Sequence, residues 1–295
     1  MTAPLFLDGG LATELEARGH DLSGELWSAR LLADDPAAII DAHQAFFRAG
    51  ARIATTASYQ ASLAGFAEAG IDRDESVRLL GLSVELAREA RITGDELVAA
   101  SIGPYGAALA DGSEYRGHYG LSVAELAAFH RPRAEILAAA GPDLLACETV
   151  PDVDEAEAML LAVEGLGVPV WLSYTIDGEA TRAGQPLIEA FAVARGNDQV
   201  VAVGVNCCDP RDVAVAVRIA REASGKPVIA YPNSGEEWDA RARRWTGTAR
   251  FSPELVGDWL AAGVTYLGGC CRVGPADIAA LADAVRQPGA GSRPG

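Results

Sequence analysis

Three cysteines in two separate segments have the residue type and the position to do chemistry. Cys207 comes just after an apolar run at residues 200–205, and the doublet Cys270-Cys271 comes just after a second run at 264–267. Each run is typical of a buried strand, so all three thiols are expected at strand ends. Thiolates bind soft cations such as zinc, and three of them leave one position of a tetrahedral ion open, which is typical of catalytic zinc. The spacing therefore predicts a Zn²⁺ site formed by these three cysteines.

The same thiols have plainer interpretations as buried structural residues or as a vicinal disulfide. Adjacent side chains of a strand point to opposite faces, so a doublet can hold one ion only where the chain leaves extended geometry. The two glycines before the second doublet, at 268 and 269, permit such a bend. Cys207-Cys208 is also a doublet, and one of its members is expected to point into the packing. Cys147, which follows a run at 144–146, is expected to be a small core residue.

Carboxylates and other polar residues also follow apolar runs. Asp8 ends a run at 5–7, and Glu148 lies at the end of the run that starts at 144. Such a pair could bind the ammonium group of a substrate, whereas the plainer interpretations are a turn residue for Asp8 and a helix cap for Glu148. Further residues expected to line a substrate site are Thr56, Ser173, Asn206, Asn233 and Trp27.

Eight short runs of branched apolar residues alternate with segments of helical length. They cover residues 5–7, 52–55, 97–102, 144–146, 168–174, 200–205, 228–230 and 264–267. Eight strand–helix units predict an α/β fold, a single (β/α)8 TIM barrel, in which every βα loop opens onto the C-terminal face where active sites lie. Long loops at 8–35, 103–121 and 231–251 are expected over that face. The alternative is a doubly wound open sheet, but the segment DGGLA at 8–12 is not the G-x-G-x-x-G loop typical of that fold.

Composition narrows the classes of partner. The formal net charge of −17 disfavours nucleic acid and anionic membranes, which need clustered Lys and Arg, and it suits a cationic substrate. No apolar run reaches the length of about 20 residues that a membrane helix needs, and the first residues do not resemble a signal peptide. Five cysteines without such a signal indicate a reducing compartment, so a cytoplasmic location is expected. The barrel is expected to occupy residues 1–286, and 287–295 is expected to be a disordered tail.

Seven segments together resemble the homocysteine S-methyltransferase family. They read LDGGLATELEARG at 7–19, ARIATTASYQAS at 51–62, SIGPYGAALADGSEYRGHY at 101–119, ETVPD at 148–152, GVNC at 204–207, YPNSGEEWD at 231–239 and GGCCR at 268–272. Each segment is a weak signal alone, but jointly they are specific and cover nearly the whole chain. The resemblance is closest to the compact branch that works without cobalamin and uses S-methylmethionine or S-adenosylmethionine.

The resemblance implies roles for individual residues. It places the zinc ligands of the family on Cys207, Cys270 and Cys271, in agreement with the spacing argument. It places contacts to L-homocysteine on four further residues, which are Asp8, Gly9, Thr56 and Glu148. The chain has Gln60 where the betaine-using relatives have a tyrosine near the second strand end, which disfavours betaine as the donor.

The implied activity is zinc-dependent transfer of a methyl group from a sulfonium donor to the thiol of L-homocysteine, which forms methionine. Zinc deprotonates a bound thiol, and four thiolates outweigh one divalent cation, so the site favours a cationic donor. No general base is then needed, which fits the lack of a histidine at a convincing catalytic position. The alternatives are a non-catalytic zinc-binding or redox-sensing thiol protein and a methyltransferase that acts on selenocysteine.

Overall fold

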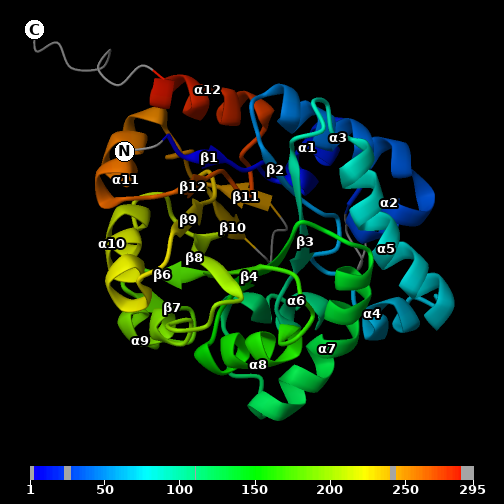
Figure 1. Cartoon of the computed structure of the whole chain (residues 1–295). Helices are drawn as coiled ribbons and strands as arrows, with labels where there is room; N and C mark the ends of the chain where they lie inside the picture. Colours follow the sequence, from blue (N-terminus) through cyan, green and yellow to red (C-terminus); the bar gives the residue numbers. More distant parts are fainter. Residues whose placement is uncertain (1–2, 23–27, 110, 240–243, 287–295) are drawn as a thin grey trace, which may run out of the picture.

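The strands form one closed barrel, as predicted. The computed structural model describes residues 3–22, 28–109, 111–239 and 244–286, and Figure 1 shows its strands at the centre of a ring of helices. Eight parallel strands pair in the order β1-β12-β9-β8-β5-β4-β3-β2. Leu7 forms a bridge with Ile53, and the amide of Asp8 donates to the Ile53 carbonyl over 2.9 Å. The chain at the end of β1 therefore also pairs with β2, the strand at the other end of this order, and the sheet closes. The fold is therefore a single (β/α)8 barrel, and the open-sheet alternative is wrong.

The strand bounds follow the apolar runs closely. They are β1 (Leu5–Phe6), β2 (Ile53–Thr55), β3 (Leu97–Ile102), β4 (Leu144–Val150), β5 (Val170–Tyr174), β8 (Val200–Asn206), β9 (Val228–Tyr231) and β12 (Tyr266–Leu267). The largest difference is β4, which continues past its apolar run into Cys147, Glu148 and Thr149. Cys147 pairs with both β3 and β5, and Val150 pairs with β5, so the strand continues past its apolar run with a register shift between these two residues.

Helices cover the outside of the sheet. The long ones are α3 (Pro36–Arg48), α5 (Arg73–Glu89), α7 (Val123–Ala139), α8 (Val153–Val163), α10 (Val213–Ser224) and α12 (Pro275–Arg286), and shorter ones are α4 (Leu63–Glu68), α9 (Leu187–Ala192) and α11 (Val256–Ala262). Ser122 and Glu125 form a capping box at the start of α7. Asp209 and Pro210 lie in a turn before α10, in which the Asp212 amide donates to the Asp209 carbonyl. Within the described part of the chain, no helix is both long and apolar enough to span a bilayer.

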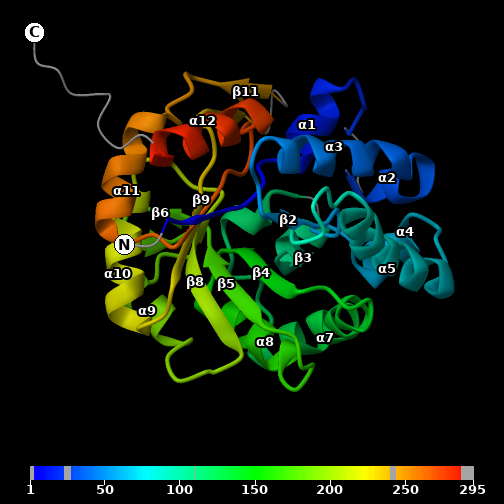
Figure 2. The ribbon, with the colours of Figure 1, turned by 45° about the horizontal axis from the view of Figure 1, so that its top comes forward.

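The three long βα connections carry elements of their own. The first contains α1 (Leu11–Ala17) and α2 (Ser28–Asp34), the second contains α6 (Tyr105–Leu109) and the 3₁₀ turn η1 (Ser113–Tyr115), and the third contains the hairpin β10 (Glu237–Asp239) and β11 (Arg244–Thr246). A second hairpin, β6 (Ile176–Asp177) and β7 (Ala180–Thr181), follows β5. Figure 2 shows β4, β5 and β8 side by side. In that view β11 and α1 lie near the top, above these strands.

The barrel interior is filled mainly by alternate strand residues, which form a floor beneath the C-terminal face. Its buried members are Leu7, Ile53, Ala99, Ala146, Trp171, Ala202, Ile229 and Tyr231. Three of these are alanines, so the interior has room for the two large rings of Trp171 and Tyr231, whose centroids lie 6.1 Å apart. The Trp171 indole donates a hydrogen bond to the Tyr231 hydroxyl over 3.0 Å. The polar group at the edge of this floor is the Tyr231 hydroxyl, which also donates a hydrogen bond to Glu148.

The close approach of β8 to β9 gives a test of the fold. A Cβ atom added at Gly204 would lie 1.7 Å from the Ile229 carbonyl oxygen, which belongs to the backbone of β9. We expect Gly204→Ala to lower the free energy of unfolding by about 2 kcal/mol or more, because two paired strands would have to move apart. The denaturant midpoint followed by circular dichroism measures this loss.

Gly81 in α5 is the matched control, because nothing outside its own helix lies within 4 Å of an added Cβ. Gly81→Ala should raise stability by about 0.5–1 kcal/mol through helix propensity. Wild-type stability in Gly204→Ala would mean that β8 and β9 do not pack as described.

Candidate metal and substrate site

The three predicted cysteines meet on the C-terminal face of the barrel. The Sγ atoms of Cys207, Cys270 and Cys271 all lie within 4.8 Å of one another, and those of Cys207 and Cys271 are 3.7 Å apart. Cys207 follows β8 and the other two follow β12, with β9 between them. All three are free thiols, so the vicinal disulfide considered above is not formed. Three sulfur ligands in a tripod suit a soft metal ion with one open position.

Unusual backbone geometry makes this convergence possible. Cys207 has a φ of 51° and Arg272 has a φ of 65°, so the chain enters the left-handed region at both strand ends. The strand β12 ends at Leu267, directly before the two glycines, so the chain leaves extended geometry where the sequence predicted it. An added Cβ at Gly268 or Gly269 would lie 2.7 Å or 2.1 Å from its nearest neighbour, so both glycines are also needed for close packing. Arg272 lies in the turn that the Val273 amide closes onto the Cys270 carbonyl.

Neighbouring side chains hold the thiols in place. The Asn233 side-chain carbonyl accepts a hydrogen bond from the Cys271 amide over 3.0 Å. The Tyr115 hydroxyl lies 3.1 Å from the Cys207 sulfur. Hydrogen bonds from Cys270 and Cys271 lower the pKa of the Cys207 thiol well below its usual range, against the effect of burial. Asn233, one of the predicted residues, therefore contacts the cluster directly.

The other two cysteines lie apart from the cluster. Cys208 packs in the apolar layer between sheet and helices, and burial raises the pKa of its thiol well above the usual value. Cys147 is fully buried in the same layer, and burial raises its pKa to about 12. The structure thus favours Cys207 over Cys208 as the cluster member of its doublet, as expected from the sequence.

Two predicted carboxylates lie buried near the thiols. Asp8 accepts a hydrogen bond from the Thr55 amide over 2.8 Å, and Glu148 accepts one from the Tyr231 hydroxyl over 2.9 Å and another from the Ser101 hydroxyl. Burial raises the pKa of Glu148 to about 7. Burial also raises the pKa of Asp8 well above its usual range, and the charge of Glu148 adds to this effect. A cationic group placed between them would stabilise both ionised carboxylates.

Asn206 and Ser173 belong to the same buried hydrogen-bond network as Glu148. The Asn206 side-chain oxygen accepts from the Thr149 amide over 2.8 Å and from the Ser173 hydroxyl over 2.9 Å. The Ser173 hydroxyl also lies 2.6 Å from that of Tyr231, which in turn donates to Glu148. Thr149 has a φ of 59°, a rare conformation for a β-branched residue, and Asn206 holds it on both sides. Both predicted residues are fully buried, so the geometry suits support of Glu148 better than contact with a ligand.

Three predicted residues remain, namely Thr56, Gly9 and Trp27. Thr56 donates to or accepts from Ser58 and accepts from the Ser101 amide, while the neighbouring Thr55 contacts Asp8. An added Cβ at Gly9 would lie 2.3 Å from a backbone oxygen, so only glycine fits there. Trp27 lies outside the described residues.

Some polar residues near the site were not predicted. Ser101 and Tyr231 donate hydrogen bonds to Glu148. The sequence signal that could have identified them is a polar residue inside an apolar run, for Ser101, or directly after one, for Tyr231. Tyr115 and Glu114 belong to η1 in the long connection after β3, and nothing local in the sequence shows that this turn reaches β8. Glu114 is 5% exposed, and its Oε2 atom has no hydrogen-bond partner within the described part of the chain. Burial, followed by the negative charge of Cys207, raises the pKa of Glu114 to about 7.

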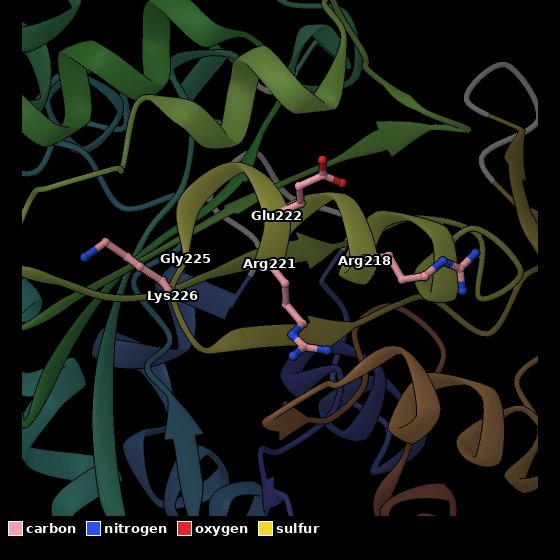
Figure 3. A pocket seen from close by; sticks show the side chains of 5 residues that line it. All are labelled: Arg218, Arg221, Glu222, Gly225 and Lys226. Atoms are coloured by element: carbon pink, nitrogen blue, oxygen red, sulfur yellow. The ribbon is translucent and has the colours of Figure 1, made fainter.

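A surface hollow of about 410 Å³ lies elsewhere, at the end of α10. Figure 3 shows that its long side chains point in different directions and do not converge on one point. Arg221 donates to the Ala262 carbonyl and Lys226 donates to the Asn197 carbonyl. Two of its cations therefore already have acceptors, so this hollow offers no organised site.

Comparisons with known proteins agree with the geometry. The family model described as homocysteine S-methyltransferase matches residues 5–285. The homocysteine S-methyltransferase of Escherichia coli (strain K12) is 48% identical over 290 residues, covering 94% of each chain. The homocysteine S-methyltransferase YbgG of Bacillus subtilis (strain 168) is 41% identical over 302 residues, covering 95% of this chain and 94% of that protein.

Solved structures give the same result. The metallated form of the homocysteine methyltransferase MmuM from Escherichia coli superposes with a TM-score of 0.85 at 45% identity, covering 97% of each chain. The oxidized form of the same enzyme superposes with a TM-score of 0.84. With sequence, fold and thiol cluster in agreement, the chain belongs to the homocysteine S-methyltransferase family.

Proposed function

We propose that this protein transfers a methyl group from a sulfonium donor to the thiol of L-homocysteine, with zinc as its cofactor, and so forms methionine. The observation that carries this proposal is the convergence of three free thiols, with Sγ atoms within 4.8 Å of one another, beside two buried carboxylates. The thiols suit a metal that binds a sulfur substrate. The carboxylates suit the ammonium group of an amino acid.

The thiol cluster has the chemistry of a zinc site. Its ligands are three sulfur atoms without a histidine or carboxylate among them, which favours a soft or borderline cation over magnesium or calcium. A zinc ion held by Cys207, Cys270 and Cys271 would act as a Lewis acid that keeps a substrate thiol deprotonated at neutral pH. The metallated form of the solved relative supports metal binding in this family.

The chain's own residues would position the acceptor. Asp8 and Glu148 would bind its ammonium group, and the hydroxyls of Ser101 and Tyr231 fix the direction of the Glu148 carboxylate. The rest of the proposed substrate set comprises Gly9, Trp27, Thr56, Ser173, Asn206 and Asn233. Binding both ends of the acceptor would align its sulfur for displacement, which is the main contribution a protein can make to such a transfer.

A sulfonium donor fits the charge of the site. Three thiols, of which Cys207 has a lowered pKa, and two buried carboxylates gather here in a chain whose formal net charge is −17. A cationic donor is attracted to this field, and its sulfur becomes neutral when the methyl group leaves. We propose S-methylmethionine as the preferred donor, with S-adenosylmethionine second.

The first prediction concerns metal binding. Purified protein should contain about one zinc per chain, and Cys207→Ser, Cys270→Ser and Cys271→Ser should each remove most of it, because two thiolates bind zinc far more weakly than three. Metal analysis after gel filtration measures the content. Cys147→Ser and Cys208→Ala are the matched controls and should keep the metal. Full occupancy in the Cys270→Ser, Cys271→Ser double variant would refute the assignment.

The second prediction concerns the donor. Homocysteine and the zinc-loaded enzyme should give methionine fastest with S-methylmethionine, more slowly with S-adenosylmethionine, and not at all with betaine. Turnover should stop when a chelator removes the metal and return when zinc is restored. Turnover with betaine alone would contradict the sulfonium assignment, and turnover that survives metal removal would contradict the role of zinc.

The third prediction concerns the acceptor's ammonium group. Burial places the pKa of Glu148 at about 7, so this carboxyl is mostly neutral at pH 6 and ionised at pH 8. An ammonium group binds the ionised form, so the KM for homocysteine should fall as the pH rises across this range. Glu148→Gln should raise that KM, at a cost of about 2–4 kcal/mol in kcat/KM at pH 8, while retaining zinc.

The variant should also show a shallower pH dependence than wild type, keeping only the part that arises from the substrate thiol. Asp8→Asn should likewise raise the KM for homocysteine. Glu222→Gln, which changes an exposed acid at the far end of α10, is the control. Wild-type kinetics in both Asp8→Asn and Glu148→Gln would remove these residues from the acceptor site.

A further inference from the structure

Glu114 is a buried acid that the proposed function has not used. Its side chain is 5% exposed, and its Oε2 atom has no hydrogen-bond partner among the described residues. The charges that act on it most strongly are those of Cys207 and Asp111, and both are negative. A hydrogen bond from its own backbone amide offsets part of the cost of burying the carboxylate. A buried carboxylate with one oxygen unpaired among the described residues is still costly, so its presence at the edge of the thiol cluster needs an explanation.

The chain holds this residue over the mouth of the barrel. Glu114 follows β3, which is three places from β8 in the sheet, yet the next residue, Tyr115, contacts the sulfur of Cys207. The connection after β3 therefore crosses the C-terminal face. Its η1 turn packs tightly on α6, because an added Cβ at Gly106 would lie 2.3 Å from the Glu114 amide nitrogen.

The far side of the turn is fastened as well. The His118 amide donates to the Asp152 carboxylate over 3.0 Å, and the His118 ring lies 2.9 Å from the Ala183 carbonyl oxygen. These contacts connect η1 to the start of α8 and to the segment after β7. Glu114 is thus held between fixed points, and its free oxygen does not depend on a loose loop.

Glu114 is also distinct from the acceptor carboxylates. Asp8 and Glu148 sit at the ends of β1 and β4 and receive hydrogen bonds from Thr55, Ser101 and Tyr231. Glu114 lies in the connection after β3, and the charge of Cys207 raises its pKa. The next residue, Tyr115, contacts the Cys207 sulfur. The two sets of carboxylates therefore face the thiol cluster from different elements.

We propose that Glu114 is a specificity-determining residue that binds the α-ammonium group of the sulfonium methyl donor. The inference rests on the proposed function, in which the donor is itself an amino acid. The α-ammonium keeps its charge during transfer, whereas the sulfonium loses its charge. A carboxylate on the ammonium therefore holds the donor without opposing the reaction, while one on the sulfonium would stabilise the ground state more than the transition state.

The test pairs Glu114→Gln with Glu148→Gln in the zinc-loaded enzyme. Glu114→Gln should raise the KM for S-methylmethionine at least tenfold and change the KM for homocysteine less than twofold. Glu148→Gln should show the reverse pattern. Glu114→Asp keeps the charge and should recover part of the lost affinity, and the zinc content of all three variants should equal that of wild type. A rise in the KM for homocysteine alone in Glu114→Gln would overturn the inference.

A second arm separates the ammonium from the sulfonium. Calorimetric titration with S-methylmethionine should show at least tenfold weaker binding to Glu114→Gln than to wild type. Dimethylsulfoniopropionate, which has the sulfonium but no amino group, should bind both proteins equally. A loss of affinity for both compounds would place Glu114 on the sulfonium and overturn the proposal.

The same titration distinguishes the two levels of inference. If S-methylmethionine binds in a Glu114-dependent way but no donor yields methionine, the proposed function fails and the ammonium site stands. If methionine forms but wild type and Glu114→Gln bind S-methylmethionine equally, the proposed function stands and the role of Glu114 is refuted.

Discussion

The convergence of three sulfur atoms from strands that are not neighbours is the constraint on which the rest of the site depends. β8 and β12 flank β9, so their ends can meet only if both chains turn inward above it. Cys207 has a left-handed backbone at the end of β8, while the chain leaves β12 at Leu267 and makes a turn from Cys270 to Val273 that contains the left-handed Arg272. Asn233, which follows β9, lies between the two and bonds to the Cys271 amide. Gly268 leaves no room for a side chain, because the approach of β12 to β1 is too close. The positions that break local backbone preferences are therefore those that bring the thiols together.

Charge is the second constraint. Thiols, Asp8, Glu114 and Glu148 gather in a buried region, where each ionised group raises the pKa of its neighbours. The hydrogen bonds to Asp8 and Glu148 come from neutral groups, namely a backbone amide and the hydroxyls of Thr55, Ser101 and Tyr231. Neutral donors orient a carboxylate without neutralising it, so its attraction for a cation remains available. The buried Arg133, by contrast, donates to the carbonyls of Ala61 and Gly103 and thereby ties the connections after β2 and β3 together. Arg133 thus serves the structure, as do the buried Asp152 and Glu155, whereas Asp8 and Glu148 have only neutral hydrogen-bond partners.

The sequence was sufficient for the barrel and for the cluster of three thiols, but not for the contacts that cross the C-terminal face. Apolar runs marked all eight barrel strands, since burial on both faces leaves a clear signal. The last residues of β4 were missed because Glu148 interrupts the apolar run and the register shifts between Cys147 and Val150. Strand-end position was enough to find Asp8 and Glu148. Thr55, which bonds to Asp8, was not singled out, whereas the resemblance pointed to the neighbouring Thr56. Glu114 and Tyr115 were missed for a different reason. Their connection crosses the face from β3 towards β8, and no periodicity or local motif encodes how far a loop reaches.

These arrangements together explain why a site of this charge can favour transfer. In-line displacement between two sulfur atoms requires that two amino acids approach the same point from different directions. In the proposed reaction each substrate carries an ammonium group that does not react, and the carboxylates proposed to bind these groups lie on different elements, at strand ends for the acceptor and in η1 for the donor. Binding at such remote, unchanging charges can fix the two sulfurs without stabilising either reactant at the reacting bond. Once the methyl group has moved, the donor has lost its sulfonium charge while its ammonium remains. The attraction that brought the donor to an anionic mouth is then weaker for the product, which favours release over the reverse step.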